Sequence, residues 1–318
     1  MSGDPRGGPI EVAVIGAGPA GLSATLNLVR ARRRTLLIDS NRPRNAATFH
    51  SHGFITRDGV SPVELRKLGR QELDEYPHYE YHQALVSTVE PAEGGFRIVT
   101  KGPGLEKNVY LAQTVVIATG LTEIHPDLPT LRAFYGTSIQ SCIECYGYTA
   151  SDQSIALIAG PEAADGTDDL AECAVLLSRY SDDVIVFTNK TGHISESDAQ
   201  ALESRGIRID PRPVADVAGD RTGLTGVVLE SGETVPRTFA FVRPGWDPKL
   251  QFAAALGLDV DASGLIVTDG SGHSSVAGVY AAGESSSPGA QQLIVAAGEG
   301  ARGAARLNRD LLGLPYLN

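Results

Sequence analysis

The sequence near the N-terminus restricts the fold more than any other part of the chain. Residues 11–15 (EVAVI) are a short, mostly apolar run, typical of a buried strand in a parallel sheet. The glycine-rich segment GAGPAG, residues 16–21, follows at once, and residues 22–30 have the apolar spacing of a helix. A second apolar run, residues 35–38, ends at Asp39. This order of strand, glycine turn, helix, strand and acid predicts a dinucleotide-binding βαβ unit.

Each residue of this motif has an expected role. Gly16 allows the tight turn, Gly18 lets the backbone approach a pyrophosphate, and Gly21 lets the helix pack closely on the strand. The N-terminus of the helix offers N–H groups and the positive end of the helix dipole to phosphates. Asp39, about 20 residues further on, can accept hydrogen bonds from a ribose. The motif alone does not decide between FAD and NAD.

A second βαβ unit is predicted in the middle of the chain, but its glycine turn is altered. Residues 154–158 (SIALI) and 183–187 (DVIVF) are expected strands, and residues 168–179 an expected helix. The turn reads AGPEAA, in which Ala159 stands where the first glycine belongs and Pro161 where the second belongs. Proline also lacks a backbone N–H donor.

The charges around the second turn also disfavour a nucleotide. A 2′-phosphate requires an arginine after the second strand, and TNKTG at residues 188–192 has one lysine and no arginine. We therefore expect this unit to be a scaffold that does not bind NADPH productively. Four acids add negative charge where two phosphates would lie: Glu162, Asp165, Asp168 and Asp169.

Two of the three cysteines form a C-x-x-C pair, Cys142 and Cys145, just before the second βαβ unit. In a cytosolic protein with βαβ patterning, this spacing predicts redox chemistry. Structural zinc is the competing explanation, but it requires four ligands and the chain has no second C-x-x-C, so we expect no metal site. Cys173 lies on the helix expected in the second unit, where we expect a small buried residue.

Composition and charge exclude several classes of function. The 318 residues are 42% hydrophobic and 20% charged, which fits a globular protein of about two domains. The net charge of -11 argues against a nucleic-acid or anionic-membrane partner, because phosphates would be repelled. The N-terminus lacks the apolar run of a signal peptide, and no stretch reaches the roughly 18 apolar residues of a membrane span. We expect a cytoplasmic protein.

The combined motifs resemble those of the flavoprotein disulfide reductases, and specifically their low-molecular-weight thioredoxin reductase branch. The resemblance covers nearly the whole chain. The matching segments are, in order, GAGPAG at 16–21, ATG at 118–120, CIEC at 142–145, and GVYAAGE at 278–284 followed by QQLIVAAGEGARGA at 291–304.

This resemblance implies an α/β fold with two Rossmann-like (FAD/NAD(P)-binding) domains, the second inserted in the first. Residues 1–121 and 243–318 would form the FAD-binding domain. Residues 122–242 would form a degenerate NADP-binding-like domain that carries the C-x-x-C pair. The resemblance also implies a homodimer.

The resemblance further implies FAD as the cofactor of the first domain. Glu284 stands where the family has an aspartate that binds the ribityl chain. Gln292 and Leu293 open a helix whose N–H groups would stabilise negative charge on reduced flavin. The segment at residues 42–54, RPRNAATFHSHGF, is expected to line the flavin. The residues expected to bind FAD are Gly16, Ala17, Gly18, Pro19, Ala20, Gly21, Asp39, Ser40, Arg44, Asn45, His52, Val86, Ala118, Thr119, Gly120, Gly283, Glu284, Gln292 and Leu293.

Within this branch, the altered second turn and the stretch at residues 42–59 resemble the dithiol oxidases that form disulfides in natural products such as gliotoxin, holomycin and romidepsin. In the mechanism that this implies, a small-molecule dithiol attacks the Cys142–Cys145 disulfide, with Cys142 in the exchange. Cys145, nearer the flavin, passes the electrons to FAD, and O2 is the final acceptor and yields H2O2.

The chain departs from the family at Tyr146, which stands where thioredoxin reductases have an acid directly after the second cysteine. Two other functions therefore stay open: a thioredoxin-reductase-like disulfide reductase that uses NADPH or ferredoxin, and a redox sensor with bound FAD. The group that handles protons also stays open. Its candidates by residue type are Glu144, His50, His52 and His125.

Overall fold

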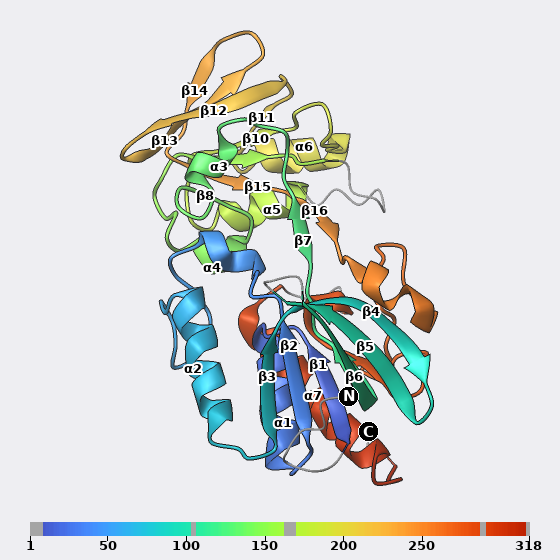
Figure 1. Ribbon diagram of the computed structural model, residues 1–318. Coiled ribbons are helices and arrows are strands. Elements are labelled where there is room, and N and C mark those ends of the chain that lie inside the picture. Colours follow the sequence, from blue (N-terminus) through green and yellow to red (C-terminus); the bar gives the residue numbers. More distant parts are fainter. Residues whose placement is uncertain (1–8, 103–105, 162–169, 287–290, 316–318) are drawn as a thin grey trace.

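The protein consists of two halves, each built on its own sheet and joined by a two-stranded ribbon (Figure 1). The computed structural model describes residues 9–102, 106–161, 170–286 and 291–315. The glycine-rich turn lies in the lower half of Figure 1, and the C-x-x-C pair lies in the upper half, near the junction.

The larger sheet has seven strands, and its central ones are apolar because both faces are covered. The path across it is β3 (Tyr79–Gln83), β2 (Thr35–Asp39), β1 (Ile10–Ile15), β6 (Lys107–Ile117), β5 (Gly95–Lys101) and β4 (Leu85–Ala92). The short strand β17 (Val279–Ala281) also pairs with β6, in parallel. The C-terminal part of the chain therefore completes the sheet that the N-terminal part begins.

Helices cover this sheet, and two of them, α1 (Pro19–Arg30) and α7 (Leu293–Asp310), pack against each other. Their backbones come close at Gly300, where an added Cβ would lie 2.0 Å from the carbonyl oxygen of Ala20. The remaining helical segments of this half are α2 (Pro62–Asp74) and the 3-10 turns η1 (Arg44–Ala47), η2 (Leu250–Leu256) and η3 (Gly283–Ser285).

The second half is built on a five-stranded parallel sheet. Its order is β11 (Arg208–Asp210), β10 (Val184–Phe187), β9 (Ile155–Ile158), β15 (Phe239–Val242) and β8 (Ile139–Gln140). Its helices are α3 (Leu131–Phe134), α4 (Ile143–Tyr146), α5 (Leu170–Leu177) and α6 (Glu196–Glu203). An antiparallel sheet of β12 (Val214–Asp220), β13 (Gly223–Leu229) and β14 (Thr234–Pro236) extends from it. Cys173 of α5 is buried in the core of this half, as predicted.

The ribbon between the halves consists of β7 (Thr122–Ile124) and β16 (Gly245–Asp247), which pair antiparallel. The chain leaves the first half along β7 and returns along β16, with Glu123 directly opposite Trp246. The predicted domain boundaries fall just before these two strands, and those boundaries stay a prediction.

The predicted fold class is confirmed, and the predicted elements agree with the structure to within a few residues. Residues 114–118 (TVVIA), which their apolar character predicts as a buried strand, belong to β6 as far as Ile117, where β6 ends. The helix predicted over residues 168–179 spans Leu170–Leu177 where it is described. Residues 168 and 169 lie outside the described residues. Over the described part of the chain, no helix combines the length and the apolar character that crossing a bilayer requires.

Two glycines on α7 give a matched test of the close approach between the helices. Gly300→Ala is expected to lower the free energy of unfolding by about 2 kcal/mol, because its methyl group would meet the backbone of α1. Gly298→Ala on the same helix meets nothing within 4 Å and is expected to raise it by about 0.5 kcal/mol. Urea denaturation measures both. Equal effects of the two substitutions would contradict the packing argument.

Candidate active site at the junction of the two halves

The first glycine turn is packed backbone against backbone. Gly16 has φ 104°, and its N–H donates to the Ile38 carbonyl at 2.8 Å. An added Cβ on Gly16 would lie 2.4 Å from the carbonyl oxygen of Ala118, and one on Gly21 would lie 1.8 Å from that of Gly16. Only glycine fits at either position, which agrees with the structural roles expected for both residues.

Gly18 differs from its neighbours, because an added Cβ there would meet nothing within 4 Å. Gly18 is the N-cap of α1, and no side chain caps that helix or adds an acid to its first turn. By contrast, Ser61 caps α2 and Ser195 caps α6. An open backbone at an uncapped helix N-terminus fits the pyrophosphate of a dinucleotide such as FAD.

Asp39 is buried at the end of β2, where the protein itself uses most of its hydrogen-bonding capacity. Oδ1 accepts the N–H of Ala17 at 3.1 Å, and Oδ2 accepts the N–H of Asn41 at 3.1 Å. Oδ2 also accepts Nη2 of Arg66 at 3.0 Å. A carboxylate has about four acceptor positions, so one remains on Oδ1 for a ribose.

Arg66 is a site residue that the sequence analysis missed. It lies on α2, its side chain is buried, and Nη2 also donates to Asn41 Oδ1 at 2.6 Å. In the sequence it is one of several charged residues on an amphipathic helix, and nothing local separates it from the solvated ones. It fixes Asp39 and the loop after β2 beneath the glycine turn.

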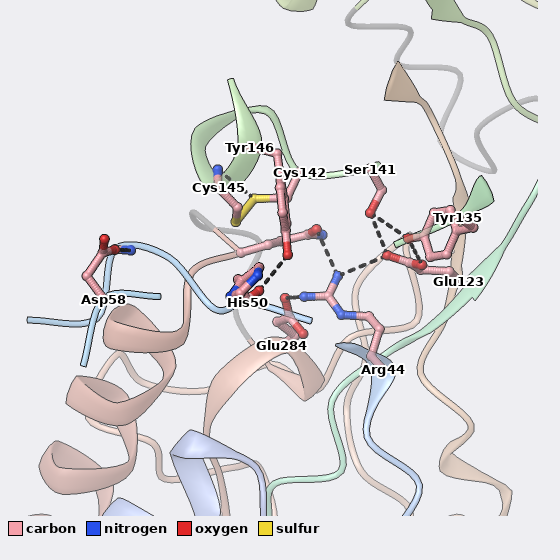
Figure 2. Close-up of a disulfide and its surroundings, with 12 residues drawn as sticks. Arg44, His50, Asp58, Glu123, Tyr135, Ser141, Cys142, Cys145, Tyr146 and Glu284 are labelled. Atoms are coloured by element: carbon pink, nitrogen blue, oxygen red, sulfur yellow. Dashed lines mark hydrogen bonds and ion pairs between the residues drawn. A yellow bond between two sulfur atoms is a disulfide. The ribbon is translucent and has the colours of Figure 1, made fainter. Parts of the chain in front are cut away.

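Arg44 contacts three segments that are far apart in the chain, and Figure 2 shows its guanidinium between Glu123 and Glu284. Nη2 donates to Glu284 Oε1, and Nη1 donates to Gln291 Oε1 at 3.3 Å. Nη1 also lies 3.7 Å from Glu123 Oε1, and the guanidinium carbon lies 5.3 Å from the centroid of the Trp246 ring. The expected flavin-lining segment is thus tied both to η3 and to the ribbon.

Glu284 is not available as a free carboxylate, because Arg44 holds it. Burial raises the pKa of the Glu284 carboxyl above its ordinary value; Arg44 opposes this shift, and the carboxylates of Glu123 and Glu299 add to it. Its neighbour Gly283 has φ 72° and donates its N–H to Glu299 Oε2 at 2.8 Å. An uncharged hydroxyl, such as those of a ribityl chain, would be a suitable further donor to Glu284.

The other residues expected around FAD fall into two groups. Pro19, Ala20 and Ala118 lie against the glycine turn, and Gly120, with φ 67°, follows β6 near Glu284. Gln292 and Leu293 open α7, whose N-terminus also has no side-chain cap.

The second group lies further from the turn. Ser40 and Asn45 are half-buried, Asn45 within η1, and Thr119 is exposed. Val86 is buried in the core of β4, so only its backbone could face a cofactor. His52 is half-buried, with Nδ1 3.5 Å from Asp58 Oδ1.

Cys142 and Cys145 form a disulfide at the start of α4, with their Cα atoms 5.3 Å apart. Cys142 is the N-cap of this short helix, and its Sγ accepts the N–H of Cys145 at 3.2 Å. Both cysteines are half-buried, while Ile143 between them anchors the helix in the core of the second half.

Tyr146, the residue that departs from the family pattern, ties the disulfide helix to the first half. Its hydroxyl donates to the carbonyl oxygen of His50, and its ring lies edge-on to that of His52 with 5.4 Å between centroids. Burial raises the pKa of the Tyr146 hydroxyl, so it stays protonated near neutral pH. It acts as a hydrogen-bond donor here, where an acid would act as a proton carrier.

The four candidates for the proton-handling group differ in their surroundings. Glu144 is exposed on α4, and His50 is exposed with Nδ1 3.1 Å from the Gly59 carbonyl. Burial lowers the pKa of His125; the Glu123 carboxylate opposes the shift and Arg132 adds to it. His125 Nδ1 is buried without a hydrogen-bond partner. The base among these residues and His52 stays unassigned.

The second glycine turn differs from the first in its described residues, 159–161. Ala159 donates its N–H to the Phe187 carbonyl at 3.0 Å, as Gly16 does to Ile38, but it has no positive φ. The close approach falls instead on Gly160, where an added Cβ would lie 1.5 Å from the carbonyl oxygen of Arg243. Pro161 follows at once; Glu162, Asp165, Asp168 and Asp169 lie outside the described residues.

The segment after β10 also packs onto this turn. The Thr191 hydroxyl donates to the carbonyl oxygen of Gly160 at 2.7 Å. Lys190 Nζ, the single cation of the TNKTG segment, is 2.6 Å from Glu230 Oε1. Asn189 Oδ1 accepts the N–H of Val214 at 2.8 Å. The side chains of Asn189, Lys190 and Thr191 thus each have a partner within the protein.

Comparisons with known proteins agree with this architecture. The family model described as pyridine nucleotide-disulphide oxidoreductase matches residues 10–300. "Thioredoxin reductase sirT" of Leptosphaeria maculans is 30% identical over 317 residues, which cover 95% of this chain and 94% of that protein.

Solved structures agree as well. The putative thioredoxin reductase TrxB from Bacillus anthracis superposes with a TM-score of 0.86 at 34% identity, covering 96% of this chain and 99% of that one. HlmI superposes with a TM-score of 0.85 at 35% identity, covering 96% of this chain and 93% of HlmI. The chain belongs to the pyridine nucleotide-disulphide oxidoreductases, which are flavin-dependent, and within them to the thioredoxin reductases. The resemblance seen in the motifs is thereby confirmed, and the protein is a disulfide oxidoreductase.

The buried pair of Asp39 and Arg66 gives a test that does not depend on turnover. Asp39→Ala is expected to lower the free energy of unfolding of the FAD-free protein by about 3 kcal/mol, because Arg66 is left without its carboxylate. The variant is also expected to retain FAD less well, since the ribose loses an acceptor. Lys67→Ala, at an exposed position on the same helix, is the control and should change stability by less than about 0.5 kcal/mol. Full FAD occupancy with unchanged affinity would count against the ribose contact.

Proposed function

We propose that the protein is an FAD-dependent dithiol oxidase that forms a disulfide in a small-molecule, natural-product dithiol, with O2 as the final acceptor. One observation carries this proposal: the disulfide is retained, while the second glycine turn has Pro161, which lacks an N–H, at the position of the open Gly18 of the first turn. A reductase needs an electron donor such as NADPH, and Pro161 cannot supply the backbone N–H that a pyrophosphate would need at this position. An oxidase needs no NADPH, because its electrons come from the dithiol substrate.

The first half fits FAD as the cofactor. Gly18 leaves an open backbone at the uncapped N-terminus of α1, for the pyrophosphate. The N-terminus of α7, opened by Gln292 and Leu293, would stabilise negative charge at the flavin. When bound, FAD supplies a two-electron acceptor for the enzyme dithiol and a site where O2 is reduced to H2O2.

The cysteines carry the electrons from the substrate toward the flavin. One substrate thiolate attacks Cys142 Sγ, which breaks the protein disulfide and leaves Cys145 as a thiolate. The second substrate thiolate then attacks the mixed disulfide, so that the product disulfide leaves and Cys142 is released. The overall change converts one dithiol and one O2 into one disulfide and one H2O2. We propose a cytoplasmic homodimer, from the family resemblance.

A second candidate function is a disulfide reductase that uses NADPH or ferredoxin, which the names of the thioredoxin reductase relatives favour. Anaerobic addition of NADPH distinguishes the two. Rapid bleaching of the flavin would support the reductase, and no bleaching with NADPH but rapid bleaching with a dithiol would support the oxidase.

Oxygen consumption tests the proposed direction. With a small dithiol in air, the enzyme is expected to consume O2 and release about one H2O2 per disulfide formed, because the flavin carries two electrons. No NADP⁺ or NADPH should be required. An oxygen electrode and a peroxide assay measure the ratio, and a strict requirement for NADP⁺ would overturn the proposal.

The two cysteines are expected to differ. Cys142→Ser leaves Cys145 as a single thiol near the flavin and should show a long-wavelength charge-transfer absorbance band. Cys145→Ser should not show it. Absorbance spectra of the two purified variants provide the measurement, and the reverse pattern would exchange the two assigned roles.

A further inference from the structure

The ribbon between the halves carries a buried carboxylate that the proposed chemistry does not use. The side chain of Glu123 is 7% exposed. Oε1 accepts the Ser141 hydroxyl at 2.8 Å, and Oε2 accepts the hydroxyl of Tyr135. Arg44 Nη1 lies 3.7 Å from Oε1, and His125 Nε2 lies 3.5 Å from Oε2. Glu123 thus joins residues of the second half to Arg44 of the first half.

Two hydrogen bonds flank the disulfide directly (Figure 2). Ser141, bound to Glu123, is the residue before Cys142. Tyr146, which donates to the His50 carbonyl, is the residue after Cys145. The chain on each side of the pair is therefore anchored, once through the ribbon to η1 and once to the loop that follows η1.

The ribbon needs such anchors, because two strands by themselves are marginally stable and twist readily. Arg44 supplies one of them. Its guanidinium contacts both Glu123 and Trp246, which are cross-strand neighbours in the ribbon. Glu284 of η3 holds the same guanidinium from the side of the first half. Charge and stacking thereby fix the ribbon on the part of the first half where the flavin is expected.

We propose that Arg44, Glu123, Ser141 and Tyr146 form a clamp that holds the disulfide against the first half, so that electrons pass from Cys145 to the cofactor without reorientation of the halves. Glu123 and Tyr146 are positioning residues, since they act through Ser141 and through the His50 backbone. This inference rests on the proposed function, which places FAD in the first half. In that function the second half brings no nucleotide to the flavin, so a fixed orientation is compatible with turnover.

Alkylation of Cys145 in the Cys142→Ser holoenzyme measures the clamp. In the holoenzyme the flavin is expected to cover this half-buried thiol, so that iodoacetamide reacts with it mainly in the opened form and the rate follows the opening equilibrium. Glu123→Ala is expected to raise the rate roughly tenfold, because charge-assisted hydrogen bonds are lost. Tyr146→Phe removes one hydroxyl and is expected to raise it about threefold. The double variant should show the product of the two effects, because both contacts close the same junction.

Glu230→Ala is the matched control. It removes an exposed carboxylate of the second half that pairs with Lys190, and the alkylation rate should not change. Glu123→Gln keeps the shape of the Glu123 side chain without its charge, and it replaces Glu123→Ala if the Glu123→Ala protein does not fold. FAD content and melting temperature exclude general unfolding, and mass spectrometry counts Cys173 separately.

Unchanged alkylation rates in both the Glu123 and the Tyr146 variants would overturn the clamp. The charge-transfer band of the Cys142→Ser protein tests the proposed function rather than the clamp. Its absence would contradict the cysteine roles of the proposed function, while the comparison of alkylation rates still decides whether the clamp exists.

Discussion

The structure depends on a set of backbone contacts that only glycine allows. Gly16 lies against the Ala118 carbonyl, Gly21 against that of Gly16, and Gly300 against that of Ala20. These contacts bring β1, α1 and α7 together so closely that no side chain fits between their backbones. The N-termini of both helices have no side-chain cap, and Gly18, the N-cap residue of α1, leaves space beside its backbone. The same steric constraint that builds the core thus creates the room for a cofactor.

The two βαβ units show how a small change in such a turn alters its chemistry. In both units the residue after the first strand donates its N–H to the neighbouring strand. In the first, that residue is Gly16, which turns with a positive φ and leaves Gly18 open. In the second, Ala159 has no positive φ, and Gly160 comes against the Arg243 backbone. The parallel sheet survives, because it depends on apolar strands, while Pro161 stands at the position of the open Gly18 and has no N–H to donate.

The charged residues at the junction of the halves are constrained by electrostatics rather than by steric fit, because a buried charge without a partner is costly in free energy. Three charged groups meet there, with Arg44 between Glu123 and Glu284. Burial raises the pKa of Glu284, and Arg44 opposes this shift, so the carboxylates are tolerated only through their partners. Hydroxyls of Ser141 and Tyr135 complete the environment of Glu123. The junction is therefore a connected polar network in which each member depends on the others.

The sequence by itself determined the strands and helices of both βαβ units, the glycine turn with its steric roles and the cysteine pair, because all of these are local patterns of apolar spacing and small residues. The fold class followed from the resemblance of these motifs, taken together, to a known family. Only the tertiary structure decided which charges meet. Arg66 lies 27 positions from Asp39 and 25 from Asn41, and Arg44 lies 240 positions from Glu284. The tertiary structure also decided that Gly160 lies against the Arg243 backbone and that Val86 is buried. Such pairings depend on how distant segments pack in three dimensions, and local sequence patterns do not record that packing.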